Sequence, residues 1–297
     1  MSSQTDAATA IPSVFDLRGR RAVVTGASTG IGRATVTALV RAGFQVWATV
    51  RKDSDAERLR AEHPRTVRTV HLDLLDDGSV RAMGEEVCAA GALHAVVNNA
   101  GAALPGPLEL MPVEVLRRQL DINLVGQLAV TQAVMPALWR ARADGDAPRI
   151  VMVGSIGGRI AGPVLGPYHA AKFGLVGLTD SLRAELAPFG MHVVLVEPGV
   201  IATPIWRRGL GTNDQLAASL PDGGGRYAGQ VARARRNAER NATHGADPEL
   251  VARAITEAVS ARRPRPRVLV GRDAKVTAAL TRLLPARLLY RVTAARS

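Results

Sequence analysis

Short apolar runs rich in β-branched residues alternate along this chain with longer segments that have helical periodicity. Seven runs have the length and composition of strands, at residues 21–25, 45–50, 67–72, 94–98, 149–154, 192–197 and 267–271. The segments between the first six are long enough for helices, such as 31–42, 112–142 and 168–189. Apolar strands separated by helices predict a parallel sheet covered on both faces. We therefore expect an α/β fold, a doubly wound parallel sheet (Rossmann fold), with ligands at the carboxyl ends of its strands.

The same pattern predicts one domain with additions. Residues 1–15 are small and polar and predict a flexible tail, and the strand and helix repeat occupies residues 16–271. Residues 203–246 interrupt it with a Gly-rich and Arg-rich stretch that is too long for an ordinary connection, which predicts a helical substrate lid. Residues 272–297 form a basic, amphipathic C-terminal extension.

Positive charge is concentrated in that extension and the eleven residues before it. Residues 261–297 hold ten basic residues and one acid, and the rest of the chain carries only +3 of the net charge of +12. This distribution and an aromatic content of 3% argue against a nucleic-acid-binding surface. Helical spacing of Val276, Leu280, Leu283 and Leu284 between arginines leaves two interpretations. The apolar stripe packs on the body or a second subunit, or it makes a weak peripheral contact with an anionic membrane.

Composition also indicates the compartment. The N-terminus lacks the basic start and apolar core of a signal peptide, and no apolar run reaches the roughly 18 residues of a membrane span. The single Cys88 cannot form an intrachain disulfide and has no zinc-type partners. We expect a cytoplasmic protein without a structural metal.

The stretch TGASTGIG, Thr25–Gly32, directly follows the first predicted strand and opens a helix. Its glycines at 26, 30 and 32 would let the backbone turn tightly and approach a pyrophosphate at the helix N-terminus. An ordinary glycine turn is the alternative. The position between a strand and a helix favours dinucleotide binding.

A second constellation places Ser155, Tyr168 and Lys172 at fixed offsets. Tyr168 and Lys172 lie one helical turn apart, so the ammonium can sit near the phenol. A phenol has an ordinary pKa of about 10, which a neighbouring cation lowers toward neutrality. Tyr168 could then exchange a proton with a substrate, while Ser155 donates a hydrogen bond to the substrate oxygen.

Several motifs in their order and spacing resemble those of the short-chain dehydrogenases/reductases. They are the glycine loop, NNAG at residues 98–101, DINLVG around Asn123, Ser155 before the Tyr168 and Lys172 pair, and PGVIAT at residues 198–203. The likeness runs from about Asp16 to Thr203 and is greatest to the branch with hydroxysteroid and retinol dehydrogenases. It implies a catalytic set of Asn123, Ser155, Tyr168 and Lys172, with Asn123 completing a proton relay and Lys172 also holding the nicotinamide ribose. It also implies a homodimer or homotetramer.

The resemblance further implies which residues bind the cofactor. They are Gly26, Ser28, Gly30, Ile31, Gly32, Arg51, Asp73, Leu74, Asn99, Ala100, Gly101, Tyr168, Lys172, Pro198, Gly199, Val200 and Thr203. Some have other interpretations: the Asn98 and Asn99 pair as a turn, and Asp73 as a helix N-cap. Thr203 is expected to bond the carboxamide, and His169 is expected to serve packing or to face solvent.

The end of the second predicted strand bears on cofactor choice. An acid that binds the ribose 2′-hydroxyl is expected about 20 residues past the glycine loop. Val50 stands there instead, followed by Arg51 and Lys52. This favours NADP(H) over NAD(H), although Arg51 stacked on adenine would give no preference.

These motifs predict an NADP(H)-dependent oxidoreductase that interconverts a carbonyl and an alcohol on a bulky apolar substrate. A non-catalytic sensor of the dinucleotide is the alternative from another class, but the full catalytic set argues against it. Reduction of a carbon–carbon double bond is disfavoured because related reductases space the Tyr and Lys more widely.

Overall fold

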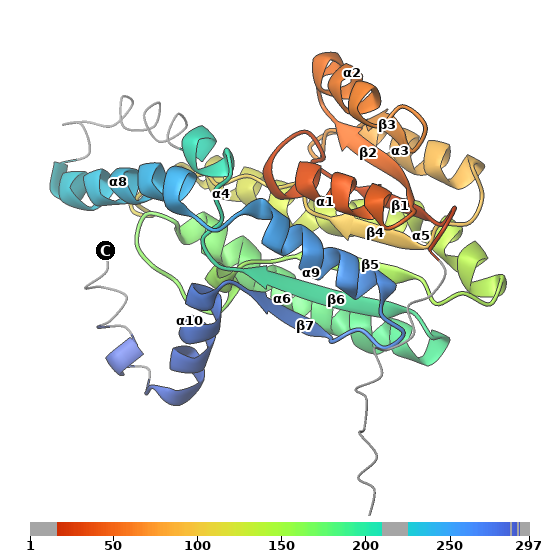
Figure 1. Ribbon diagram of the computed structural model, residues 1–297. Coiled ribbons are helices and arrows are strands. Elements are labelled where there is room, and N and C mark those ends of the chain that lie inside the picture. Colours follow the sequence, from red (N-terminus) through yellow and green to blue (C-terminus); the bar gives the residue numbers. More distant parts are fainter. Residues whose placement is uncertain (1–16, 210–224, 286, 290, 292–297) are drawn as a thin grey trace, which may run out of the picture.

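The computed structural model describes residues 17–209, 225–285, 287–289 and 291. Its centre is a parallel sheet of seven strands in the order β3-β2-β1-β4-β5-β6-β7 (Figure 1). The strands are β1 (Arg21–Val24), β2 (Gln45–Val50), β3 (Val67–His71), β4 (Ala95–Asn98), β5 (Arg149–Val153), β6 (His192–Pro198) and β7 (Arg267–Val270). All seven predicted strands and the doubly wound fold are thus confirmed.

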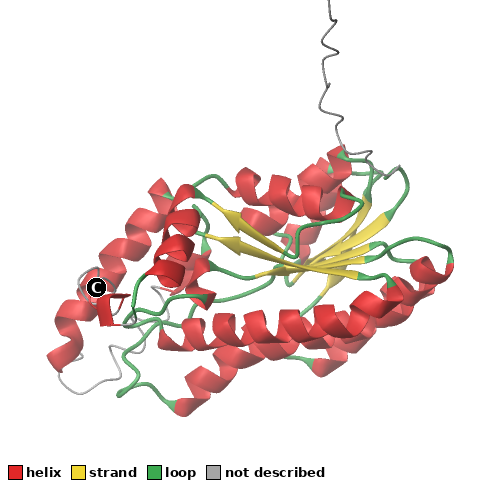
Figure 2. Ribbon diagram, turned by 90° about the horizontal axis from the view of Figure 1, so that it is seen from below, coloured by secondary structure: helices red, strands yellow, loops and turns green. Residues whose placement is uncertain are grey.

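Helices cover both faces of this sheet, as Figure 2 shows from below. The helices in the described part of the chain are α1 (Gly30–Arg41), α2 (Asp53–Glu62), α3 (Asp77–Ala89), α4 (Val113–Leu120), α5 (Gly126–Ala143), α6 (Gly166–Leu186), α8 (Ala228–His244), α9 (Pro248–Ser260) and α10 (Arg272–Leu283). Strand residues alternate between two cores: Val24 and Val46 pack with α1, α2 and α9, whereas Val23 and Trp47 pack with α3, α5 and α6. Because both faces are covered, the strands are apolar throughout.

The sheet order reverses between β1 and β4. From β1 the chain proceeds to β2 and β3 on one side, and it returns to β4, β5, β6 and β7 on the other. Ligands bind at such a reversal, beyond the carboxyl ends of the strands. The loops after β1 and β4 therefore border the expected site.

The predicted lid and extension lie near the carboxyl ends of β6 and β7 (Figure 1). The lid contains α8, and a bridge between Ile201 and Ala246 connects it to the segment after β6. Helix α10 begins the C-terminal extension and packs on the body through buried Ala274 and Ala278. The predicted tail 1–15, residues 210–224 of the lid and residues 292–297 lie outside the described part of the chain.

One helical stretch among the described residues, Val113–Ala143, is long and apolar enough to cross a membrane by length and composition. It comprises α4, a π-helical turn (Asp121–Val125) and α5. Val130, Val134 and Leu138 of α5 are fully buried in the core beneath the sheet. Packing of these residues in the core accounts for the apolar character of α5.

Candidate active site

The loop after β1 makes close contact with the loop after β4. The Thr25 hydroxyl accepts hydrogen bonds from the backbone N–H groups of Asn99 and Ala100, both at 2.9 Å. In return, the Asn99 side chain donates to the carbonyl oxygens of Thr25, at 2.9 Å, and Gly26, at 3.3 Å. The glycine loop is therefore fixed by the NNAG segment, so the Asn pair is more than a turn.

Each glycine of the loop has a steric reason. Gly26 has φ +64°, and a Cβ there would lie 2.8 Å from Ala100 Cα. Gly30 has φ +54°, and a Cβ there would lie 2.9 Å from Thr203 Cγ2. A Cβ on Gly32 would lie 2.1 Å from the Gly26 carbonyl oxygen. A side chain at any of these positions would clash with neighbouring atoms, so only glycine allows this conformation of the loop.

The glycine loop leads directly into the first turn of α1. No side chain caps α1, and its first turn contains no acid. The N–H groups of that turn, from Ile31 and Gly32, thus point at a position suited to an anion. This cradle fits the pyrophosphate of a dinucleotide.

Asn98, the last residue of β4, is buried. Its side-chain nitrogen donates to the Thr131 hydroxyl of α5 at 2.8 Å and lies 3.3 Å from Met152 Sδ of β5. Asn98 therefore braces the sheet against α5, whereas Asn99 holds the glycine loop.

The loop after β5 and helix α6 bring Ser155, Tyr168 and Lys172 together. Tyr168 is 9% exposed, and the Lys172 Nζ lies 5.7 Å from the centre of its ring. Burial raises the pKa of the Tyr168 phenol, and a hydrogen bond with Ser155 opposes this with a smaller effect. The sequence led us to expect a lowered pKa; here burial outweighs the neighbouring groups.

Lys172 is buried in the same place. Its ammonium donates to the Val153 carbonyl oxygen at 2.9 Å. Burial lowers the pKa of Lys172 from 10.5 to about 8, because a desolvated ammonium is less stable than the neutral amine. This amine can therefore change charge near neutral pH.

Asn123 lies in the π-helical turn between α4 and α5 and is fully buried. Its oxygen accepts from the Ala102 N–H at 2.9 Å, and its nitrogen donates to the Ala102 carbonyl at 2.8 Å. The side chain thus fixes the segment after β4.

Asp73 and Leu74 follow β3. Asp73 Oδ1 accepts from the Leu75 N–H at 3.0 Å, which closes a local turn. The N-cap of α3 is Asp76, whose side chain accepts from Gly78 and Ser79. The alternative interpretation of Asp73 as a helix N-cap is therefore wrong. Leu74 packs beside Gly126, where an added Cβ would lie 3.0 Å from Leu74 Cβ.

Two guanidinium groups lie on the β2 side of the glycine loop. Val50 ends β2 and is buried, and the side chain of Arg51 beyond it is exposed. Arg58 of α2 donates to the Ser28 carbonyl oxygen at 3.0 Å and pairs with Asp55 at 2.7 Å. No acid ends β2, as the sequence indicated. The structure adds Arg58, beside the glycine loop, as a second cation that could bind a 2′-phosphate.

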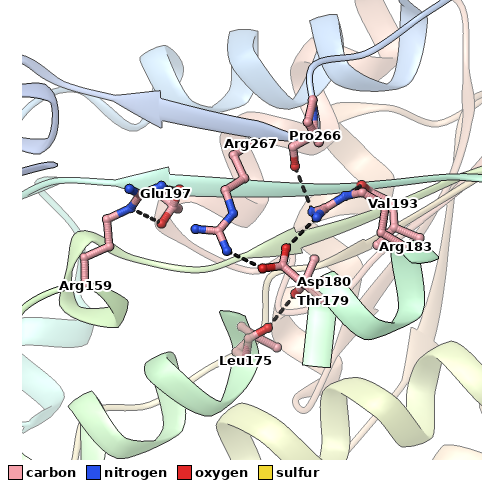
Figure 3. A network of polar contacts seen from close by, with 9 residues as sticks. All are labelled: Arg159, Leu175, Thr179, Asp180, Arg183, Val193, Glu197, Pro266 and Arg267. Atoms are coloured by element: carbon pink, nitrogen blue, oxygen red, sulfur yellow. Dashed lines mark hydrogen bonds and ion pairs between the residues drawn. The ribbon is translucent and has the colours of Figure 1, made fainter. Parts of the chain in front are cut away.

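An ion pair stabilises the loop that follows Ser155 (Figure 3). Arg159 makes two hydrogen bonds of 2.7 Å to the carboxylate of Glu197, which is fully buried in β6. This bonding raises the pKa of the Arg159 guanidinium. Glu197 precedes Pro198 and Gly199, so the pair connects the Ser155 loop to the PGVIAT segment.

A second cluster in Figure 3 connects α6 to the last strands. Asp180 of α6 accepts hydrogen bonds from Arg183 and from Arg267 of β7. Burial raises the pKa of Asp180, but the hydrogen bonds and charges of the two arginines together outweigh it and lower the pKa. The helix that carries Tyr168 is thus held against the sheet at its far end.

A cavity of about 370 Å³ lies beside the predicted catalytic residues, since Ile156, next to Ser155, and His169, next to Tyr168, line it. Its walls near the catalytic positions are apolar, from the loop 156–165 and from Trp206, whose indole N–H donates to the Ile201 carbonyl oxygen at 2.9 Å. His169 also borders the cavity, and its Nδ1 lies 2.9 Å from the Gly157 carbonyl oxygen. The expectation that His169 serves packing or faces solvent was incomplete, since its ring lines this cavity.

The C-terminal extension contributes to the same site. The carboxylate of Asp273, in the first turn of α10, accepts from the Val200 N–H at 2.6 Å. It also fills the space beside Gly199, where an added Cβ would lie 2.2 Å from its oxygens. Thus PGVIAT is held by α10 on one side and contacts Gly30 through Thr203 on the other.

Sequence reasoning missed several of these residues. Arg58, seven residues after Arg51, was a usable signal for the second cation. The single acid in a basic extension was a weaker signal for Asp273. The predicted lid at residues 203–246 includes α8, but the sequence did not indicate which of its side chains would face the cavity. Among the described residues, no group of three or more His, Cys, Asp or Glu could hold a metal ion.

Comparison with known proteins agrees with this geometry. A family profile described as "short chain dehydrogenase" matches residues 20–212. The NADPH-dependent 3-dehydrocapnine reductase of Ornithobacterium rhinotracheale is 33% identical over 92% of this chain and 95% of that protein. Mouse retinol dehydrogenase 5 is 35% identical over 89% of this chain and 84% of that protein.

Solved structures extend the likeness to three dimensions. A short chain dehydrogenase from Burkholderia cenocepacia in complex with NADP is 25% identical, with a TM-score of 0.71 over 94% of this chain and 99% of that one. A 3-ketoacyl-(acyl-carrier-protein) reductase from Brucella melitensis complexed with NADH is 26% identical, with a TM-score of 0.69 over 85% and 96%.

Proposed function

This chain belongs to the short-chain dehydrogenases and is an oxidoreductase; we propose that it interconverts a carbonyl and an alcohol on a bulky apolar substrate. The observation that carries the proposal is the meeting of Ser155, Tyr168 and Lys172 beside a largely apolar cavity at the carboxyl edge of the sheet. The relatives named above are reductases or dehydrogenases, which gives no support to a non-catalytic sensor.

The proposed reaction divides its work among these residues. A nicotinamide cofactor, held by the glycine cradle and the loops after β4 and β6, supplies or accepts the hydride. The Ser155 hydroxyl donates a hydrogen bond to the substrate oxygen as negative charge develops there. Tyr168 gives its phenolic proton to that oxygen in reduction and takes it back in oxidation.

Proton transfer requires the pKa of Tyr168 to fall from its raised value. Lys172 is the nearest cation, and a charge at this distance acts strongly because both groups are buried. The ammonium must be protonated to have this effect, and its pKa of about 8 makes that protonation sensitive to pH. We propose that Lys172 sets the alkaline limit of activity in this way.

Substitution of Tyr168 by Phe tests the role of the phenol. The ring and its packing remain, so NADPH should bind with unchanged affinity in a fluorescence titration. We expect kcat/KM for carbonyl reduction to fall by about 100-fold or more, because general acid catalysis is lost. Tyr227→Phe removes an exposed phenol that bonds Glu109 and is the matched control. If Tyr168→Phe retains a tenth of wild-type activity, another group moves the proton.

We also propose that NADP(H) is preferred over NAD(H). In support, Arg51 directly follows β2, Arg58 bonds the Ser28 carbonyl oxygen of the glycine loop, and Val50 stands where an acid would bind a ribose hydroxyl. A guanidinium is well suited to bind a phosphate through two hydrogen bonds. The reductase from Ornithobacterium rhinotracheale is named as NADPH-dependent, which supports this choice.

A further part of the proposal concerns the location and assembly of the protein. We propose a cytoplasmic homodimer or homotetramer that makes a weak peripheral contact with anionic membrane through α10. In support, the side chains of Val276 and Leu283 are 56% and 77% exposed, although the sequence pattern would allow them to pack on the body. Exposed Lys275 and Arg282 lie on the same helix.

A further inference from the structure

Helix α8 presents an unusual face to the cavity. Gln230, Asn237 and Asn241 line it, and Ala234 and Ala238 lie between them. The spacing of seven and four residues places the three amides in one stripe along the helix. A helix that covers an apolar cavity would ordinarily present large apolar side chains to it. The residues of α8 that line this cavity are instead the three amides, the two alanines and Arg235.

These three amides are partly buried, and within the described part of the chain none of their side chains forms a hydrogen bond. A primary amide has two donors and one acceptor with two lone pairs. Placing such a group against an apolar cavity without a partner is unfavourable. A ligand that brings its own polar group into the cavity would satisfy them.

The rest of the cavity has a different character. Ile156, Ile160, Val164 and Leu165 line it on the side of the Ser155 loop, next to the start of α6 and Tyr168. Thr277 of α10 adds a hydroxyl, and Asp273 is already bonded to the Val200 N–H. Arg235 of α8 is paired with Glu239 at 3.4 Å. The cavity is therefore apolar near the reacting groups, and at α8 it is lined by amides and by one guanidinium whose charge is balanced by Glu239.

We infer that the substrate is amphiphilic. The reacting carbonyl or alcohol belongs to an apolar segment of the substrate, and the remote end carries a neutral hydroxyl or amide that forms hydrogen bonds with the amides of α8. This inference rests on the proposed function and adds the class of substrate to it. A site built to hydrogen-bond a substrate group discriminates strongly against the analogue that lacks the group, because its own polar atoms are then left without partners. Helix α8 would thus select the substrate at a distance from the chemistry.

The test uses matched pairs of ketones. Straight-chain methyl ketones of increasing length are compared with the same ketones carrying a terminal hydroxyl, with the full chain and NADPH. At the length that spans the cavity, we expect kcat/KM for the hydroxylated ketone to exceed that of the plain one by about 10-fold or more. Equal values, or a preference for the plain ketone at every length, would overturn the inference.

Variants locate the preference. Asn237→Leu and Asn241→Leu keep the side-chain size and remove the amide, so each should lower the ratio of kcat/KM for the hydroxylated ketone to kcat/KM for the plain ketone by about fivefold or more. Thr243→Val, a polar-to-apolar change on the exposed side of α8, is the matched control. If both Asn variants keep the wild-type ratio of kcat/KM between the two ketones, the amides of α8 do not recognise the substrate.

A binding measurement separates this inference from the proposed activity. An absence of turnover with every ketone would count against the proposed carbonyl and alcohol interconversion, yet a ligand that binds the folded protein still raises its melting temperature. Terminal diols should raise it more than the matching alcohols, and the difference should disappear in Asn237→Leu. Equal rises with diol and alcohol would refute the role of α8 whatever the turnover shows.

Discussion

At the scale of single residues, the site combines groups whose charges are costly to bury. Lys172 and Tyr168 are both buried, and burial moves their pKa values in opposite directions: that of the ammonium falls and that of the phenol rises. Both shifts favour the neutral forms. The proposed reaction, by contrast, needs the charged ammonium. The folded protein therefore gives up stability at the position where that reaction requires a buried cation.

This cost gives a prediction for Lys172. Its pKa is about 8 in the folded protein against 10.5 unfolded, so between these values the unfolded chain binds more protons. The free energy of unfolding should therefore rise with pH through that range, by about 3 kcal/mol at most. Urea unfolding at about pH 7 and about pH 10 measures this rise.

The rise should be absent in Lys172→Met, which has no titrating amine. Lys275→Met, at an exposed lysine, should behave as wild type. Equal pH dependence in wild type and Lys172→Met would show that the ammonium is not desolvated.

A second residue-scale prediction concerns cofactor choice. Arg51→Leu and Arg58→Leu should each lower kcat/KM with NADPH by about tenfold or more, because a hydrogen bond to a charged phosphate is lost. Values with NADH should change little, and Val50→Asp with Arg51→Leu should reverse the preference. Arg60→Leu, on the same helix but bonded to Thr69, is the control. A higher wild-type kcat/KM with NADH would refute the NADP(H) proposal.

At the scale of elements, the site depends on loops that are joined to one another. The glycine loop is bonded to the loop after β4, the Ser155 loop to β6, and PGVIAT to α10. Each contact joins segments that are distant in sequence. The catalytic geometry is therefore a property of the carboxyl edge of the whole sheet.

The ion pair between Arg159 and Glu197 tests this dependence. Arg159→Met leaves a fully buried carboxylate without its cation, and we expect the free energy of unfolding to fall by about 3 kcal/mol or more. Glu197→Gln should cost less, because Arg159 keeps an acceptor and has some contact with solvent. Turnover should fall in both as the Ser155 loop loosens.

Urea unfolding gives the comparison. Arg117→Met breaks a surface ion pair whose side chains are 68% and 75% exposed, so it should change stability by under about 1 kcal/mol. If Arg159→Met is no more harmful than this control, the buried pair does not hold the loop.

At the scale of the whole molecule, the extension has two different sides. Its alanines and Asp273 contact the body and the PGVIAT segment, whereas Val276, Leu283 and Leu288 are 56%, 77% and 46% exposed. Arg282 and Arg287 are exposed near these leucines. An apolar surface with neighbouring cations matches an anionic lipid surface better than water.

We predict that the full chain sediments with anionic vesicles at low salt and much less with neutral vesicles. Each cation near the surface should contribute about 1 kcal/mol, weakened by added salt. Replacing Lys275, Arg282 and Arg287 by Gln should abolish the binding, whereas Gln at exposed Arg65, Arg81 and Arg118 should not. These point variants are preferable to truncation at Gly271, which would also remove Asp273 from the site.

No binding of the full chain to anionic vesicles at low salt would refute the membrane contact. The exposed stripe would then be expected to pack against a second subunit. Light scattering of the same samples would measure the assembly directly.

The sequence alone determined the fold and the family, because periodicity and short-range motifs record local requirements. Apolar strands separated by helices require a covered parallel sheet, and the glycine loop, Ser155, Tyr168 and Lys172 stand at spacings that a strand end or a helical turn imposes. Those relations act over a few residues, so they can be read along the chain. They were sufficient to identify a dinucleotide-dependent oxidoreductase.

Only the tertiary structure decided how distant segments meet. It placed Arg58 beside Ser28, Arg159 against Glu197, and Asp273 on the Val200 N–H. It also turned the amides of α8 into the cavity and reversed the expected direction of the Tyr168 pKa. Burial and contact depend on how the whole chain packs, and two residues far apart in sequence leave no periodic trace of their meeting.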